Sequence, residues 1–282
     1  MTIAVTGATG QLGRRIVAQL LERVPASEVV AVVRDEAKAA DLTAQGVQVR
    51  VADYTDVAAL TDAFAGVEKV VLVSGNEIGQ RAVQHGNVIE AARAAGVTFI
   101  AYTSVLHADG SPLLVAPEHV ETEALLASSG LSYSLLRNGW YHENYAPSID
   151  AARASGAVVT SAGDGRVASA SRDDFAAAAA VVVTSDAPEQ VYELSGDVAW
   201  TQSELAAAIG EVIGSDVSVL DVDAAKHREI LSGAGLDEGS VFFVVTTDGH
   251  IAEGHLADAP GTLSALIGRP TTPLVDTLRT LA

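Results

Sequence analysis

The chain contains no cysteine and only three lysines among its 282 residues. Without cysteine it can form no disulfide, no iron–sulfur cluster and no thiolate nucleophile. The lysines are Lys38, Lys69 and Lys226, and none of them follows a glycine. The sequence therefore excludes the glycine-rich loop, ending in Gly-Lys, with which many nucleotide triphosphatases hold phosphate.

Positive charge is also scarce, because 17 Lys and Arg residues face 36 Asp and Glu residues, a net charge of -19. This excess of negative charge repels nucleic acids and anionic membrane surfaces. No apolar run approaches the roughly 18 residues that a membrane helix needs, and the chain opens without a basic leader. We expect a cytoplasmic protein with no membrane insertion and no nucleic-acid partner, which could form a homodimer.

Short β-branched runs alternate with longer Ala- and Leu-rich runs of helical period over the first half of the chain. This alternation is typical of parallel strands joined by crossover helices. The predicted strands are 3–6, 29–33, 47–51, 70–73, 99–103 and 133–136, and the predicted helices are 12–23, 36–44, 57–64, 79–94 and 119–128. The sequence thus predicts an α/β fold with a Rossmann-like doubly wound parallel sheet.

The alternation stops after Asn144, where glycine-broken segments separate shorter elements. We therefore expect an NADP-binding Rossmann domain over 1–150 and a smaller C-terminal α/β substrate-binding lobe over 151–282, with some elements returning to the main sheet. The nine apolar residues 175–183 predict a buried helix. Thr201 and Glu204 have the spacing of a capping box and predict a helix start.

A glycine-rich segment follows the first predicted strand and has its glycines three residues apart. It comprises Gly7, Ala8, Thr9, Gly10, Gln11, Leu12 and Gly13. Glycines at this spacing permit a tight turn, a close approach of the backbone to a pyrophosphate and close packing of helix on strand. The pattern alone also suits an ordinary glycine turn, but its place between a strand and a helix favours a dinucleotide site.

Arg34 follows the second predicted strand, where an NAD-selective site has Asp or Glu on the ribose 2′-hydroxyl. A guanidinium there can hold the additional 2′-phosphate of NADP in a bidentate manner. Asp35 leaves an alternative open, because its carboxylate could bind the ribose of NAD instead. We favour NADPH, with NADH the less favoured cofactor.

Two further positions follow predicted strands and are candidates for cofactor contacts. Asp53 follows the third strand and could accept from the adenine amino group, or it could cap the next helix together with Asp56. Ser74, Gly75 and Asn76 follow the fourth strand, where they could line the cofactor or form a plain turn.

Taken together, these features resemble the short-chain dehydrogenase/reductase superfamily. The Tyr-x-x-x-Lys pair of that superfamily is missing, because Arg34, Ala65 and Val222 stand four residues before the three lysines. Its absence points to the NmrA-like atypical subgroup. The segments that carry this resemblance are 6–13, 79–81, 99–104, 106–109, 136–141, 162–165 and 266–270. The resemblance weakens over 239–260.

The resemblance implies an NADPH-dependent oxidoreductase that transfers hydride to quinones. It also implies that a further segment contacts the cofactor, namely Asn138, Gly139, Trp140, Tyr141, His142 and Glu143. An alternative within the same subgroup is a redox sensor that binds NADP(H) without turnover.

A quinone acceptor is consistent with the missing tyrosine–lysine pair. Hydride addition to a quinone gives a delocalised, weakly basic anion that water can protonate afterwards, so positioning matters more than proton donation. Tyr102 and His107 are candidate donors to the quinone oxygen, and Trp140 and Tyr141 could pack against its ring. Aromatic residues next to a strand end are more often part of core or interface packing than of a substrate site.

We expect no metal site. His250 and His255 are five residues apart, which is the wrong spacing for one face of a helix.

Overall fold

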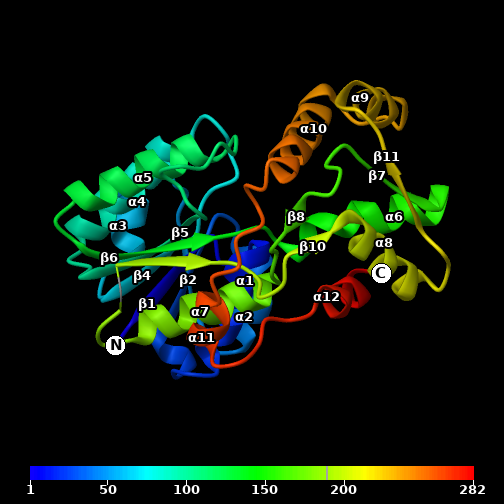
Figure 1. The fold of residues 1–282 in the computed structure, drawn as a ribbon. Coiled ribbons are helices and arrows are strands. Elements are labelled where there is room, and N and C mark those ends of the chain that lie inside the picture. The colour runs from blue at the N-terminus through cyan, green and yellow to red at the C-terminus, as the bar shows by residue number, and fades with distance from the viewer. Residues whose placement is uncertain (189) are drawn as a thin grey trace. The chain divides into compact units, whose positions relative to one another are not determined.

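The computed structural model describes residues 1–188 and 190–282, which are shown in Figure 1. Seven strands form one sheet in the order β3-β2-β1-β4-β5-β6-β9, and every neighbouring pair is parallel. The strands are β1 (Ile3–Thr6), β2 (Val29–Val33), β3 (Gln48–Val51), β4 (Lys69–Leu72), β5 (Phe99–Val105), β6 (Ser132–Asn138) and β9 (Val191–Leu194). This confirms the predicted Rossmann-like doubly wound sheet.

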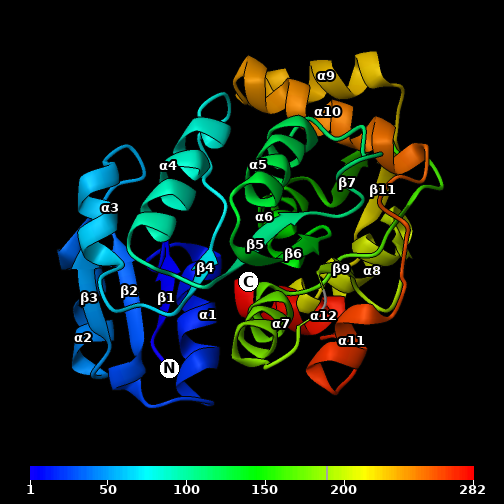
Figure 2. The same cartoon turned by 90° about the vertical axis from the view of Figure 1, so that its left-hand side faces the viewer.

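The central strands are apolar on both faces because helices cover both sides of the sheet. Every residue of β1, β2 and β5 is buried, as expected for a parallel sheet between two helical layers. Helices α3 (Val57–Ala63), α4 (Arg81–Ala94) and α5 (Ala116–Ser128) lie on one face, and α1 (Gln11–Leu21) and α7 (Arg172–Thr184) lie on the other (Figure 2). Shorter helical turns flank the sheet at η1 (Ala26–Glu28), η2 (Glu36–Ala39) and α2 (Ala40–Ala44).

The strand order reverses between β1 and β4, which lie side by side although two strands separate them in sequence. In open α/β sheets ligands bind at the carboxyl ends of the strands beside such a reversal. The glycine-rich segment follows β1 and the 74–76 loop follows β4, so both predicted cofactor loops lie at this point.

The chain divides into two compact units, and each unit is made of several segments of the chain. The first unit comprises 1–110, 115–138 and 172–194, and the second comprises 111–114, 139–171 and 195–282. The segment 172–194 rejoins the first unit because α7 packs on the sheet and β9 adds to its edge beside β6. The nine apolar residues 175–183 lie within α7, and all of them except Val181 are buried.

The second unit combines short strand pairs with helices. Its elements are η3 (His142–Tyr145), α6 (Ala146–Ser155), β7 (Ala157–Thr160), β8 (Arg166–Val167), β10 (Trp200–Thr201), α8 (Gln202–Ile213), β11 (Ser218–Asp221), α9 (Ala224–Gly233), α10 (Glu238–Ala252), α11 (Thr262–Ile267) and α12 (Leu274–Leu281). β7 pairs with β11 in parallel, and β8 pairs with β10 in antiparallel. The predicted capping box between Thr201 and Glu204 begins α8.

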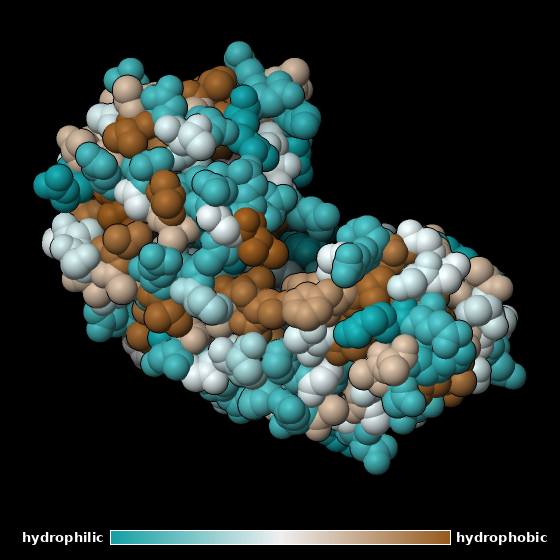
Figure 3. All heavy atoms as spheres, turned by 90° about the horizontal axis from the view of Figure 1, so that it is seen from above, coloured by the Kyte–Doolittle hydropathy of each residue, from teal (hydrophilic) through white to brown (hydrophobic). Residues whose placement is uncertain are grey.

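Each unit has its own apolar core. The first is built on the sheet around Phe64, Leu72 and Ile100, and the second lies around Ile149, Leu205 and Ile209. On the surface shown in Figure 3, hydrophobic side chains are interspersed among hydrophilic ones. Among the described residues, no helix has both the length and the apolar composition needed to cross a membrane.

Candidate functional site

The glycine-rich segment forms a tight turn between β1 and α1. Gly7 has a φ of +57°, and its carbonyl accepts a hydrogen bond from the Gly10 N–H at 2.9 Å. A Cβ on Gly13 would lie 2.3 Å from the Gly7 oxygen, so α1 approaches the turn too closely for any side chain at that position. These are the turn and the close helix–strand packing that a pyrophosphate-binding loop requires.

The first turn of α1 is open to an anion. Within the described part of the chain, no side chain caps Gly10 and no acidic residue lies in the first turn of this helix. The free N–H groups and the positive end of the helix dipole therefore attract a phosphate group. The residues present fit a dinucleotide pyrophosphate, both by the missing side chain at Gly13 and by this uncapped helix end.

Arg34 lies directly after β2 with its side chain 65% exposed, and its guanidinium pairs with Glu77 at 3.2 Å. Asp35 has a different role, because its carboxylate accepts from the Ala37 N–H at 3.0 Å and begins η2. The guanidinium is thus the accessible group at this strand end, and a 2′-phosphate could replace the Glu77 carboxylate as its partner.

Asp53 lies between β3 and α3 and forms a local turn. Its carboxylate accepts from the Thr55 hydroxyl at 2.6 Å and from the Thr55 N–H at 2.9 Å. These bonds stabilise the charged form and lower the pKa of Asp53. The cap of α3 is Asp56, which accepts from the Ala59 N–H, so Asp53 does not share that role.

The 74–76 loop is held in place by side chains that the sequence analysis did not single out. The Gly75 N–H donates to Nε2 of His85 at 3.0 Å, and Arg81 Nε donates to the Gly75 carbonyl at 2.8 Å. The Ser74 N–H donates to the Thr103 hydroxyl at 2.8 Å. The backbone of the loop is therefore fixed at Ser74 and Gly75. None of these three hydrogen bonds uses the Asn76 side chain.

The hydrogen bonds of His85 define its tautomer. Because Nε2 accepts from Gly75, the ring proton is on Nδ1, which lies 3.0 Å from the Thr122 hydroxyl. The Thr122 hydroxyl in turn donates to the Glu118 carbonyl at 2.8 Å. Burial lowers the pKa of His85 to about 3, so the imidazole is neutral and acts as a fixed support for the loop.

Tyr102, one of the two candidate donors, is fully buried on β5. Its phenol oxygen lies 2.7 Å from Nδ1 of His119, and burial raises the pKa of Tyr102 well above its usual value. Burial also lowers the pKa of His119 to about 3. The pair belongs to the core between the sheet and α5, and a quinone oxygen cannot reach it in this conformation.

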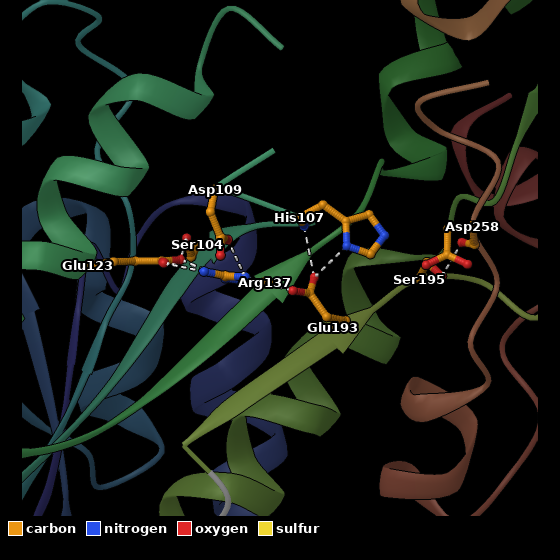
Figure 4. Close-up of polar contacts among 8 residues, drawn as sticks. All are labelled: Ser104, His107, Asp109, Glu123, Arg137, Glu193, Ser195 and Asp258. Carbon is orange, nitrogen blue, oxygen red and sulfur yellow. Dashed lines mark hydrogen bonds and ion pairs between the residues drawn. The ribbon is translucent and has the colours of Figure 1, made fainter. Parts of the chain in front are cut away.

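His107, the other candidate, lies beyond β5 with 47% of its side chain exposed. Its φ is +53°, a left-handed conformation that is uncommon for a residue other than glycine. The His107 N–H donates to Glu193 at 2.8 Å, and Nδ1 lies 3.6 Å from the same carboxylate oxygen (Figure 4). Glu193 therefore orients an accessible imidazole at the carboxyl end of the sheet.

Arg137 of β6 organises the carboxylates around His107. Its guanidinium pairs with Glu123 of α5 at 2.6 Å, with Glu193 of β9 at 2.8 Å and with Asp109 at 2.6 Å (Figure 4). The hydrogen bond to Glu123 is the largest cause that raises the pKa of Arg137 above its usual value, and Glu193 adds to it against the opposing effect of burial. The network joins the ends of β6 and β9. In the sequence, the only indication of it is that Arg137 directly precedes Asn138, which was predicted to contact the cofactor.

The 138–143 segment spans both units. Asn138 ends β6, is buried, and accepts through its carbonyl from the Leu106 N–H at 3.0 Å. In the second unit, Tyr141 forms a bridge with Ala170, and the buried imidazole of His142 lies 3.0 Å from the Thr277 hydroxyl. His142 thus anchors η3 to α12.

Trp140 belongs to an aromatic group within the second unit. Its indole stacks on Phe243 with ring centroids 6.2 Å apart and planes 20° apart. Its Nε1 is buried, as is the Tyr145 hydroxyl, and neither has a hydrogen-bond partner among the described residues. Gly139 and Glu143 flank this group and are half-buried.

Comparison with known proteins places this geometry among dinucleotide-dependent enzymes. A family profile described as NAD(P)H-binding matches residues 7–186. Quinone oxidoreductase 2 of Escherichia coli (strain K12) is 53% identical over 98% of this chain and 97% of its own length. The crystal structure of NADPH-dependent quinone oxidoreductase from Escherichia coli, complexed with NADPH, has a TM-score of 0.95 and 52% identity, with 99% of both chains covered. Triphenylmethane reductase of Citrobacter sp., complexed with NADP(H), has a TM-score of 0.94 and 38% identity over 100% of both chains.

Proposed function

Because the chain belongs to the NAD(P)H-binding family, we propose that it is an NADPH-dependent oxidoreductase that transfers hydride to quinones. The observation that carries the proposal is the full-length similarity to an enzyme named quinone oxidoreductase 2. The turn around Gly7 and Gly13 supports it independently, since Gly13 packs against the backbone of Gly7 as closely as a dinucleotide-binding loop requires.

We assign the cofactor contacts to the loops at the carboxyl edge of the sheet. The segment from Gly7 to Gly13 would hold the pyrophosphate, Arg34 the 2′-phosphate and Asp53 the adenine amino group. The loop of Ser74, Gly75 and Asn76 would lie along the cofactor. The segment from Asn138 to Glu143 is assigned to the nicotinamide end on the strength of the family resemblance.

The bound cofactor supplies a hydride, and the chain supplies orientation and a proton. His107 is the candidate donor that fits best, because its imidazole is accessible and Glu193 accepts from its backbone and faces Nδ1. Trp140 and Tyr141 are assigned to packing against the flat acceptor ring.

The test is anaerobic stopped-flow mixing of the protein and NADPH with a small benzoquinone, followed through the loss of reduced-nicotinamide absorbance. The proposal expects a faster loss than in the mixture without protein. Equal rates together with tight NADPH binding would instead favour a redox sensor without turnover. An azo dye and a triphenylmethane dye belong in the same panel, because similar proteins are named azoreductase and triphenylmethane reductase.

A cytoplasmic location and assembly into a homodimer are further parts of the proposal. With no cysteine, the chain has no disulfide that a reducing compartment could break. Cell fractionation tests the location, and analytical ultracentrifugation of the full chain tests the dimer.

A further inference from the structure

The carboxyl end of α10 brings together His250 and His255, which are five residues apart in the sequence. Helix α10 ends at Ala252, between His250 and His255 (Figure 1). Gly254 has a φ of +83° and turns the chain back, and the His255 N–H donates to the His250 carbonyl at 3.0 Å. Because this turn follows the last residue of the helix, helical spacing does not apply, and the two rings lie with centroids 5.9 Å apart.

Glu253 lies between the two imidazoles. One oxygen of its carboxylate is 3.2 Å from Nε2 of His255 and 3.9 Å from Nδ1 of His250. One ligand atom from each of the three residues lies within 4.8 Å of the others. Three donor side chains from the end of α10 and the turn after it thus lie close together.

We propose that His250, Glu253 and His255 bind a divalent transition-metal ion, with Zn²⁺ as the representative. Two imidazole nitrogens and one carboxylate oxygen form a three-ligand set that leaves one tetrahedral position for water. Imidazole donors select transition metals over Ca²⁺ and Mg²⁺, which prefer oxygen ligands. Donors around a tetrahedral zinc ion lie about 3.4 Å apart, given Zn–N bonds of roughly 2.1 Å. The separations at Glu253 are close to that distance, and the proposal is independent of the proposed reductase function.

The surroundings of this cluster favour a cation. The last carbonyls of α10 place the negative end of a helix dipole beside the three ligands. A surface pocket of about 590 Å³ adjoins the turn, and Asp164, Asp221 and Glu253 contribute carboxylates to its lining. The net charge of -19 adds a general attraction for cations.

The backbone of the turn is fixed before any ion binds. A Cβ on Gly165 would lie 2.4 Å from the Ile251 carbonyl oxygen, so the 162–165 loop packs directly on the end of α10. Two of the ligand side chains are accessible, since His255 is 41% and Glu253 66% exposed, whereas His250 is 17% exposed. A site of this kind needs only small side-chain rotations to close around an ion, which lowers the entropy cost of binding.

The experiment is isothermal titration of chelator-treated full-length protein with ZnCl₂, repeated with CoCl₂ to record the visible ligand-field bands of bound Co²⁺. We expect one ion per chain and a rise in melting temperature that depends on zinc concentration. His250→Ala and His255→Ala should each weaken binding at least tenfold and abolish the tetrahedral Co²⁺ bands. Glu253→Gln should weaken binding as well, and because the Glu253 side chain is exposed, this substitution leaves the packing of the protein unchanged.

His107→Ala is the matched control, because His107 is an exposed histidine in the first unit. It should retain the stoichiometry and affinity of the unmodified protein. Unchanged binding in the His250→Ala and His255→Ala double variant would overturn the proposal, and so would the absence of saturable binding in the unmodified protein.

Discussion

At the scale of single residues, cofactor choice depends on one guanidinium at the end of β2. Arg34 is exposed and has Glu77 as its partner, while Asp35 is occupied with the start of η2. We expect Arg34→Ala to weaken NADPH binding by about 1.5 to 3 kcal/mol, the loss of a charged hydrogen-bond partner, and to change NADH binding little. Calorimetric titration with both cofactors measures the difference.

Glu77→Gln is the complementary control for Arg34. Because it removes a carboxylate that competes for the guanidinium, NADPH binding should be unchanged or tighter in this variant. Equal losses for NADPH and NADH in Arg34→Ala would show instead that Arg34 supports the loop rather than the 2′-phosphate.

The candidate donors also differ at the residue scale. His107 is accessible beside Glu193, whereas Tyr102 is enclosed by the core and His119. We expect His107→Gln to lower kcat with a benzoquinone by about tenfold, less than the usual range for general acids because the anion formed is weakly basic. NADPH affinity should stay the same in steady-state and binding measurements.

Tyr102→Phe separates the two candidates. This substitution removes only a buried hydroxyl, so it should reduce stability and leave kcat close to that of the unmodified protein. If kcat fell in Tyr102→Phe and not in His107→Gln, the core would have to open during turnover and the assignment to His107 would fail.

At the scale of elements, the contact between α1 and the turn after β1 leaves no room for a side chain. We expect Gly13→Ala to destabilise the protein by about 1 to 3 kcal/mol and to abolish tight NADPH binding. The reason is that all three close atoms, the Gly7 carbonyl oxygen, the Gly7 carbonyl carbon and the Ala8 Cα, belong to the backbone and cannot rotate away. Chemical denaturation and a cofactor titration of the same variant measure both effects.

Gly86→Ala in α4 provides the matched comparison. Its Cβ would make an ordinary contact of 3.6 Å with Leu125, and alanine is the better helix former. The variant should gain up to about 1 kcal/mol of stability and keep cofactor binding. A similar loss of stability and of NADPH binding in Gly13→Ala and Gly86→Ala would contradict the prediction that the close packing of α1 on the turn at Gly13 is what excludes a side chain.

Local patterns predicted some elements well and others poorly. Strands β1 to β4 are short runs with β-branched residues, and the positions of β1 to β6 and the parallel sheet were predicted from the alternation of strands with helices. β9 was not predicted, because Val191–Leu194 follows α7 in sequence and joins the sheet only through tertiary pairing with β6. The break between the units likewise depends on which elements pack on the sheet, and composition does not carry that information.

Site residues show the same limit. The glycine turn has a spacing that can be recognised in a sequence, whereas the network around Arg137 unites residues from four separate segments. The approach of His250 and His255 at the end of α10 is likewise not visible in their spacing along the sequence. Five residues exclude a common helical face, but the helix ends between the two and Gly254 reverses the chain.

At the scale of the whole molecule, stability against acid depends on buried neutral histidines. His85 supports the 74–76 loop and His119 faces Tyr102, and burial lowers the pKa of each to about 3. In the unfolded chain both take up a proton near pH 6.5. The unfolded state therefore binds more protons than the folded state between pH 6.5 and about 3, and stability must fall as the pH falls through this interval.

Each of these histidines should contribute a slope of about 1.4 kcal/mol per pH unit once the unfolded imidazole is protonated. We expect the free energy of unfolding, measured by urea denaturation between pH 6 and pH 5, to fall by that amount per histidine. The glutamine in His119→Gln cannot take up a proton, and its amide can still bond to the Tyr102 phenol. The free energy of unfolding of this variant should therefore fall less steeply with pH, by about 1.4 kcal/mol per pH unit, the contribution of one histidine. An unchanged slope would mean that the folded protein accepts the proton on His119, and the burial argument for both histidines would then be wrong.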